Sequence, residues 1–326
     1  MSKIVIRIAL CTLLLALCSC TKAEQPKKVH RIGYLSATRS GPITEVFRQA
    51  LQAHGFNEGK NIAVEYRYAE GNLDRLPVLA AELVSLKVDL IVVVSGQAAS
   101  AAKQASTTIP IVMAISGDVV GTGVIKSLSH PGGNVTGMTT YHPEVGGKRL
   151  ALLKETFPKI SRVAVLGDPT SSGHPLDWQE LQPVARHLKV KLQSLEVRSP
   201  KPDFKGAFAA ATKARADAFL TLPPPLMAFH QKEIISLVAK SRRPAIFHNG
   251  EFADSGGLMS YGPDVRAGVR RAAIFVDKIL TKGAKPADLP VEQPKKFEFI
   301  INLITAKQIG VTIPQSVLYR ADRVIR

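Results

Sequence analysis

Short apolar runs and amphipathic segments alternate along most of the chain. The apolar run 31–37 is followed by segment 41–55, where apolar residues recur every three to four positions, as on one face of a helix. This strand–helix alternation continues to about residue 139 and starts again at about residue 140. Two consecutive β-α-β-α-β series predict the α/β class, with two doubly wound, Rossmann-like parallel-sheet lobes.

Individual segments refine this prediction. Residues 89–96 (DLIVVVSG) are almost wholly apolar, which indicates a parallel strand covered on both faces. Residues 61–70 alternate apolar and polar positions, as expected for a strand near a sheet edge. In the second series, the pattern predicts one continuous helix over residues 225–241.

The first twenty residues form a separate unit. Lys3 and Arg7 form a short basic region before an apolar run, 8–17. This run is too short for a permanent membrane span but suits the core of a signal peptide. All three cysteines of the chain lie here, so we expect the exported part to make no disulfide. A domain of this size can bury enough apolar surface without one.

The end of this run resembles a bacterial lipobox. In Leu17-Cys18-Ser19-Cys20, a leucine lies three residues before Cys20 and a small residue lies directly before it. We therefore expect residues 1–20 to be a lipoprotein signal peptide, Cys20 the lipid anchor and residues 21–30 a polar tether. The protein would then be membrane-anchored in the periplasm or at the cell surface. An ordinary cleaved leader is the alternative.

The net charge of +17 is high, and removal of Lys3 and Arg7 with the leader would leave 17 − 2 = +15. Such a charge raises the possibility of nucleic acid as a partner. However, the basic doublets at 27–28, 242–243 and 270–271 lie far apart, without aromatic residues between them. We expect no nucleic-acid partner, and instead a solvated basic surface or attraction to anionic lipid headgroups.

Small and polar residues follow the apolar strands, where a doubly wound sheet binds its ligands. Serine and glycine before a helix expose backbone N–H groups that suit a carboxylate, and acidic side chains could pair with an ammonium group. These residue types suit a small zwitterion such as an amino acid, although they also serve as helix caps and turn formers. The predicted ligand-binding residues are Ser36, Ser95, Gly96, Gln97, Ser116, Asp118, Tyr141, Asp168, Asn249, Glu251 and Tyr261.

Motifs for catalysis are incomplete. Ser260 lies in a segment that lacks the first glycine of G-x-S-x-G, and Gly121-Thr122-Gly123 lacks the third glycine of a dinucleotide loop. The histidines form no HExxH pattern, and we interpret His248 and Glu251 as a turn pair rather than metal ligands. We therefore expect a binding protein rather than an enzyme, without a metal or another cofactor.

Longer stretches resemble a known family. The segments PGGNVTG (131–137) and GGLMSYG (256–262), together with GKRLALLKETFPKISRVAVL (147–166), are similar to ABC-transporter substrate-binding proteins that include tryptophan- and tyrosine-binding lipoproteins. The resemblance implies a type I periplasmic binding protein fold with three hinge crossings. It also implies a small-molecule solute and, as partners, an ABC permease and its ATPase.

The chain differs from this family in the ligand-facing loops. Relatives often carry GTPAA where this chain has Ser95-Gly96-Gln97-Ala98-Ala99, and GDPVG where it has Gly117-Asp118-Val119-Val120-Gly121. We expect the first lobe to comprise residues 31–139 plus about 262–290, and the second 140–259 plus about 291–326.

The expected function is a lipid-anchored, extracytoplasmic solute-binding component of an ABC importer. It would capture a small solute in an interlobe cleft, with an amino acid as the expected class and an aromatic amino acid as the narrower expectation. A sensory binding protein that is not coupled to transport is the main alternative, and an anchored hydrolase is a weaker one. A LacI-type regulator would need a helix-turn-helix where this chain has its leader.

Overall fold

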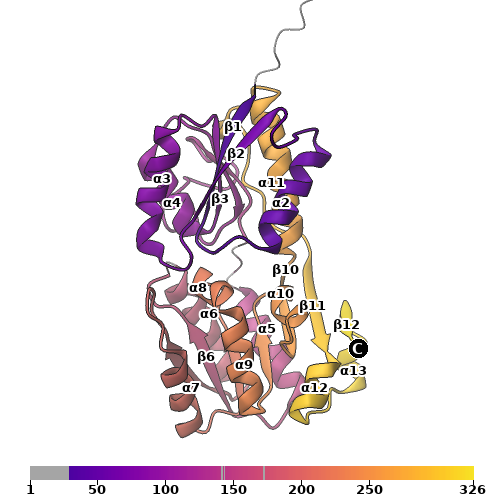
Figure 1. The fold of residues 1–326 in the computed structure, drawn as a ribbon. Helices are drawn as coiled ribbons and strands as arrows, with labels where there is room; N and C mark the ends of the chain where they lie inside the picture. Colours follow the sequence, from indigo (N-terminus) through magenta and orange to yellow (C-terminus); the bar gives the residue numbers. More distant parts are fainter. Residues whose placement is uncertain (1–28, 141, 143, 172) are drawn as a thin grey trace, which may run out of the picture.

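The computed structural model describes residues 29–140, 142, 144–171 and 173–326. Two α/β lobes lie one above the other along the long axis of the molecule (Figure 1). Within the described part of the chain, no helix has both the length and the apolar character needed to cross a bilayer.

The first lobe is built on a five-stranded parallel sheet in the order β2-β1-β3-β4-β5. Its strands are β1 (His30–Ser36), β2 (Ile62–Tyr68), β3 (Leu90–Val94), β4 (Ile111–Ile115) and β5 (Val135–Gly137). Two helices pack on each face, and one of them arrives from the C-terminal part of the chain. One pair is α3 (Leu76–Ser85), preceded by η1 (Leu73–Arg75), and α4 (Gly96–Ala105), and the other is α2 (Pro42–Ala53) and α11 (Val265–Leu280).

The second lobe contains a seven-stranded sheet in the order β12-β11-β10-β9-β8-β6-β7. All its pairings are parallel except β10 with β11, because the chain returns from the first lobe in the opposite direction. The strands are β6 (Arg162–Gly167), β7 (Lys191–Glu196), β8 (Ala218–Thr221), β9 (Ala245–Phe247), β10 (Met259–Pro263), β11 (Phe297–Asn302) and β12 (Arg323–Ile325).

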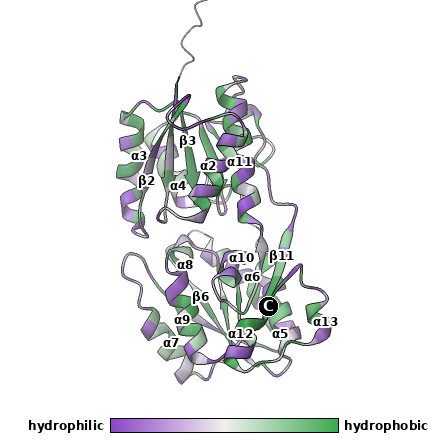
Figure 2. Cartoon of the chain, turned by 45° about the vertical axis from the view of Figure 1, so that its right-hand side comes forward, coloured by the Kyte–Doolittle hydropathy of each residue, from purple (hydrophilic) through white to green (hydrophobic). Residues whose placement is uncertain are grey.

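Helices cover both faces of this sheet as well. One face packs against α5 (Glu144–Thr156), α6 (His174–His187), α12 (Leu303–Ile309) and α13 (Gln315–Leu318). The other packs against α7 (Phe204–Lys213), α8 (Pro225–Phe229), α9 (Gln231–Ser241) and α10 (Gly250–Asp254). Figure 2 shows the apolar residues concentrated on the strands and on the inner sides of the helices.

The amphipathic pattern explains this layering. In α11, Val269, Ala272, Phe275 and Val276 are buried at i, i+3, i+6 and i+7, while Arg270 on another side of the helix is exposed. Burial of such a stripe against the sheet contributes about 25 cal/mol per Å² of apolar surface, which is the main force that holds the layers together.

Three segments cross between the lobes: the one after β5, the one between β10 and α11, and the one between α11 and β11, which includes η2 (Pro286–Asp288). β10 extends to Pro263, so the predicted first-lobe segment of about 262–290 begins within a strand of the second sheet. The third crossing is tied to the first lobe, because Glu292 N donates to Gly137 O at 2.9 Å. Gly137 has φ +119°, and a Cβ there would collide with the backbone oxygen of Met113, so only glycine fits this junction.

The predicted continuous helix over 225–241 was wrong. The structure contains α8 and α9, separated at His230, whose backbone has φ −97° and ψ 19°. The His230 ring packs against Phe204 and Phe229, with centroid distances of 5.0 Å for both pairs. The apolar periodicity did not reveal this break because both halves bury residues against the same sheet.

Candidate ligand-binding site

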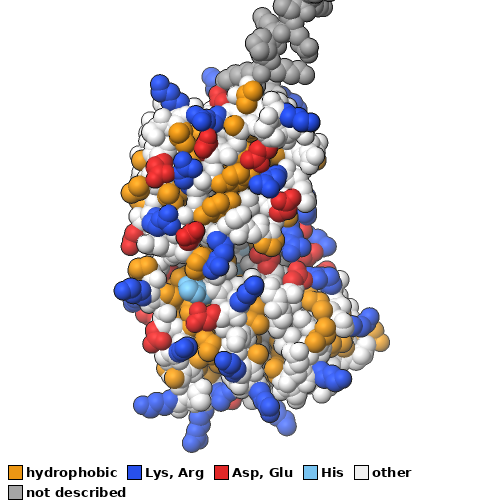
Figure 3. Space-filling model, viewed as in Figure 1, with side chains coloured by type: hydrophobic (Ala, Val, Ile, Leu, Met, Phe, Trp, Pro, Cys, Tyr) orange, Lys and Arg blue, Asp and Glu red, His pale blue; other side chains and the backbone are white. Residues whose placement is uncertain are grey.

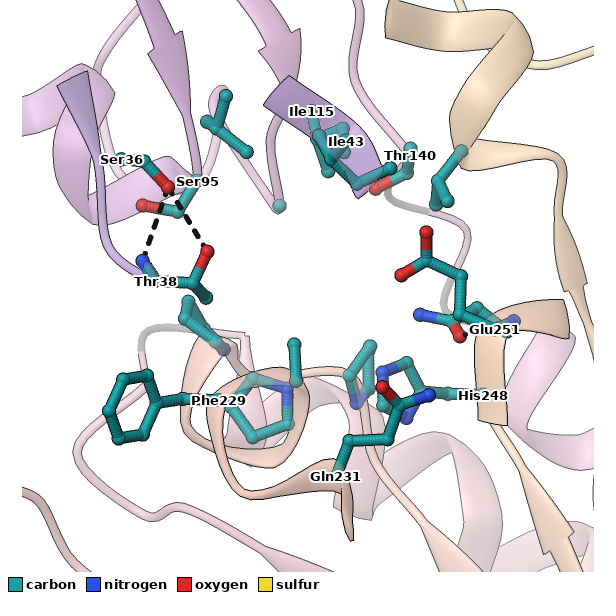
Figure 4. Close-up of a pocket in the computed structure, with 18 of the residues that line it drawn as sticks. Ser36, Thr38, Ile43, Ser95, Ile115, Thr140, Phe229, Gln231, His248 and Glu251 are labelled. Carbon is teal, nitrogen blue, oxygen red and sulfur yellow. Dashed lines mark hydrogen bonds between the residues drawn. The ribbon is translucent and has the colours of Figure 1, made fainter. Parts of the chain in front are cut away.

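A cavity of about 590 Å³ lies between the two lobes (Figure 4). The first lobe lines it with the loops that follow β1, β3 and β4, and the second lobe with α5, the start of α6, the α8–α9 region and the loop after β9. These loops meet because the carboxyl ends of parallel strands share one edge of a sheet, and these edges of the two lobes face each other.

Most predicted site residues reach this cavity. The lining includes Ser36, Ser95, Gly96, Gln97, Ser116, Asp118, Asn249 and Glu251. Tyr141 and Cys20 lie outside the residues that the structure describes. Asp168 and Tyr261 are not in the lining: Asp168 is buried in the second lobe, and Tyr261 is partly buried against its apolar core.

Asp168 and Tyr261 have structural contacts. Asp168 is fully buried, and its Oδ1 accepts hydrogen bonds from Thr170 N at 2.9 Å and Thr170 Oγ1 at 2.6 Å, which shape the loop after β6. The Tyr261 ring stacks on Phe297, with centroids 6.1 Å apart, and packs against the apolar core. Tyr261 is thus not part of the lining, but its carbonyl oxygen accepts a hydrogen bond from Arg149, which is.

Hydroxyl groups line the first-lobe side. Ser36 Oγ accepts a hydrogen bond from Thr38 N at 3.2 Å and lies 3.1 Å from Thr38 Oγ1 (Figure 4). Ser116 Oγ donates to Met138 O at 2.8 Å, and Thr140 Oγ1 donates to Ser116 O at 2.9 Å. These bonds hold the β4 end against the segment that leads into the first crossing, so the wall is preformed.

Ser95 occupies an unusual position in this wall. Its backbone has φ +141°, a region that residues with a Cβ rarely adopt. Its Oγ accepts a hydrogen bond from Ala98 N at 3.0 Å and so caps the N-terminus of α4. The residue is thus both a helix cap and a strained point in the cavity wall.

The acidic residues of the lining differ in their surroundings. Asp118 Oδ1 accepts a hydrogen bond from Gly121 N at 2.7 Å and stabilises a turn. Burial raises the pKa of Asp177, on α6, to about 6, with Arg149 opposing this shift and Asp118 adding to it. Burial also raises the pKa of Glu251, while Arg266 opposes the shift.

Two buried basic groups in the lining were not among the predicted ligand-binding residues. Arg149, on α5, is buried; its Nε donates to Tyr261 O at 3.0 Å and its Nη1 to Thr221 O at 3.2 Å. Burial lowers its pKa to about 10, so it stays charged at neutral pH. His248 Nδ1 lies 3.0 Å from Thr221 Oγ1, and burial, together with Arg149, lowers the pKa of this histidine to about 3.

The sequence does contain a signal for Arg149. Val145, Leu152, Leu153 and Thr156 are buried on the inner side of α5, and Arg149 lies four residues after the first of them and three before the second. A charged residue within a buried stripe needs a partner or a function. The predictions considered only strand ends, whereas this side chain reaches the cavity from the side of a helix.

Comparison with known proteins identifies the family of this chain. A family model described as ABC transporter substrate binding protein matches residues 35–325. A tyrosine-binding protein of Clostridioides difficile (strain R20291) is 28% identical over 294 residues, which cover 89% of this chain and 84% of the relative.

Solved structures of similar fold cover most of the chain. A conserved domain protein from Vibrio cholerae has a TM-score of 0.81 and 28% identity, covering 91% of this chain and 100% of that one. An ABC domain from Streptococcus pneumoniae in complex with L-Trp has a TM-score of 0.80 and 24% identity, covering 91% of this chain and 99% of that one. The predicted fold, that of type I periplasmic binding proteins, is confirmed. The matched family model, which covers most of the chain, shows that this protein belongs to the ABC transporter substrate binding protein family.

Proposed function

We propose that this protein is the lipid-anchored, extracytoplasmic solute-binding component of an ABC importer, and that its interlobe cavity captures an amino acid. The observation that carries this proposal is the cavity itself, to which both lobes contribute polar groups. A volume of about 590 Å³ is in the range of ligand pockets. Guanidinium, carboxyl and hydroxyl groups on its wall suit a small zwitterion.

The relatives support an aromatic amino acid as the solute. One is a tyrosine-binding protein, and a structural neighbour was solved in complex with L-Trp. The cavity also has apolar walls, including Ile43 and Ile115, on which an aromatic side chain could pack (Figure 4). Hinge bending at the three crossings would close the lobes over the bound solute.

Ligand binding is tested with protein that lacks residues 1–20. Thermal unfolding is measured with each of the twenty amino acids. A ligand at about 100 times its Kd stabilises the folded state by about 2.7 kcal/mol, which raises the melting temperature in a concentration-dependent way. If no amino acid raises it, the solute assignment is wrong.

Transport and anchoring need cellular experiments. Uptake of the radiolabelled ligand should fall when the gene is deleted and should recover with the wild-type protein. Unchanged uptake would favour the sensory alternative. Metabolic labelling with a fatty-acid probe should mark the wild-type protein, whereas Cys20→Ala should carry no label.

A further inference from the structure

Arg149 and Glu251 are charged groups of the cavity wall whose bonding within the described chain is incomplete. Resting on the proposed function, we propose that the second lobe forms a zwitterion receptor, in which Arg149 binds the carboxylate and Glu251 the ammonium group of an amino acid. This assigns a separate recognition role to each end of the ligand's main chain.

The surroundings of Arg149 lack a matching anion. Its two hydrogen bonds go to the neutral carbonyl oxygens of Thr221 and Tyr261, and Nη2 has no hydrogen-bond partner among the described residues. No carboxylate oxygen in the described chain lies within 4.0 Å of its nitrogens, although Asp177 interacts with it at longer range. A buried guanidinium without a close counter-charge is costly, and a ligand carboxylate would remove that cost. Guanidinium groups bind carboxylates through two parallel hydrogen bonds.

Within the described chain, the carboxyl group of Glu251 lacks a hydrogen-bond donor and a close cation. Its Oε1 is inaccessible to solvent and has no hydrogen-bond partner among the residues that the structure describes. The nearest cation is Arg266, whose Nε lies 4.0 Å from this oxygen and whose Nη2 lies 3.6 Å from Asp254. Figure 4 shows the Glu251 carboxyl group pointing into the cavity near Thr140. A ligand ammonium group beside this carboxyl group would supply the close positive charge that Arg266 does not.

The two groups belong to one part of the site. Arg149 is bonded to Thr221 O at the end of β8, and the Thr221 hydroxyl is bonded to His248 at the end of β9. Glu251 follows His248 by three residues. The ligand's charged groups would thus lie against the second lobe, with its side chain directed toward the apolar residues Ile43 and Ile115 of the first lobe.

Arg149 also joins the ends of β8 and β10, so a loss of affinity in a variant could reflect a structural role alone. A thermodynamic cycle separates a structural role from a ligand-binding role, because it combines a change of the residue with removal of the matching charged group from the ligand. The probes are the amino acid that binds tightest, its decarboxylated amine and its deaminated acid. For tyrosine, these are tyramine and 3-(4-hydroxyphenyl)propionate. Affinities are measured by calorimetry on protein that lacks residues 1–20.

We expect the wild type to bind the amine about 100-fold more weakly than the amino acid, as is typical when one partner of a buried charge pair is removed. In Arg149→Gln, this difference should shrink to about threefold or less, because the carboxylate no longer has its receptor. In Glu251→Gln, the difference in affinity between the amino acid and its deaminated acid should shrink in the same way. The difference between the amino acid and its amine should remain.

Arg186→Gln is the matched control, since Arg186 is exposed on α6 in the same lobe and outside the lining. This variant should bind the amine and the deaminated acid more weakly than the amino acid by the same factors as the wild type. If Arg149→Gln weakens amino acid and amine equally, Arg149 has only a structural role and the proposal is overturned. If no amino acid binds the wild type, the proposed function fails and this receptor with it.

Discussion

The guanidinium of Arg39 in the first lobe lies over the ring of Phe229 in the second, with Cζ 4.3 Å from the ring centroid. Gly71 of the first lobe packs against the same ring. Close by, Ser199 Oγ of the second lobe donates to Gly71 O at 2.9 Å. These residues form a cross-lobe contact beside the cavity.

Phe229→Ala should shift the unliganded protein toward open conformations. The lost cation–π contact is worth about 0.5–1 kcal/mol at an exposed site, which changes the ratio of closed to open forms about two- to fivefold. Small-angle scattering should show a larger radius of gyration, and a saturating ligand should restore the wild-type value. Phe229→Leu, which keeps apolar packing without the ring, should show a smaller increase. Identical scattering for Phe229→Ala and the wild type would contradict the role of this contact.

Gly71→Ala should destabilise the protein in two separable ways. Gly71 has φ +81°, so a side chain there costs about 1–2 kcal/mol. The new Cβ would also lie 2.7 Å from Phe229 Cδ1. In the Phe229→Ala background the second penalty should disappear and the first should remain, so denaturant unfolding of the four proteins should reveal non-additive effects. Strict additivity would show that the methyl group and the ring do not meet.

Ser95→Gly should stabilise the fold despite the loss of a helix cap. Relief of the strain at φ +141° is worth about 1–3 kcal/mol, whereas a serine-to-glycine change at an N-cap costs only a few tenths of a kcal/mol. The melting temperature should therefore rise by about 2–4 °C or more. Ser95→Ala keeps the strain and loses the cap, so it should lower stability by about 1 kcal/mol. A lower melting temperature for Ser95→Gly would contradict this account.

Asp177 should make stability depend on pH in the direction opposite to a salt-bridged carboxylate. Its pKa is about 6 in the folded protein and 3.8 when its surroundings do not perturb it, as in the unfolded chain, so the folded state binds more protons between these values. The free energy of unfolding contributed by Asp177 should therefore decrease as pH rises from about 4 to 6, and this destabilisation should remain at neutral pH.

Asp177→Asn tests this prediction by difference. Buried His248 contributes the opposite trend, because its pKa of about 3 lies below the ordinary histidine value of 6.5 and stability is lost as pH falls between these values. Urea unfolding is measured for the wild type and for Asp177→Asn at several pH values. The contribution of His248 is the same in both proteins, so it drops out of the difference between their free energies of unfolding. The variant should gain stability relative to the wild type as pH rises from 4 to 7. A constant difference over this range would show that Asp177 titrates normally.

The sequence by itself determined the two lobes and much of the site. Apolar runs and amphipathic stripes predict which segments become strands and helices, since burial of apolar surface depends on local period. In parallel sheets, residues just after the strands gather at one edge, so Ser36, Ser95, Ser116 and Asn249 could be placed near a common site before the structure was known.

Only the tertiary structure decided which side chains reach the cavity. Asp168 follows β6 just as Asn249 follows β9, but it turns into the interior and bonds to Thr170. Arg149 comes from the middle of α5, and its place in the wall depends on the carbonyl groups of Thr221 and Tyr261, which are 72 and 112 residues away. The physical reason is that local periodicity determines the buried face of a segment, whereas a charged side chain is oriented by partners that only the folded chain brings together.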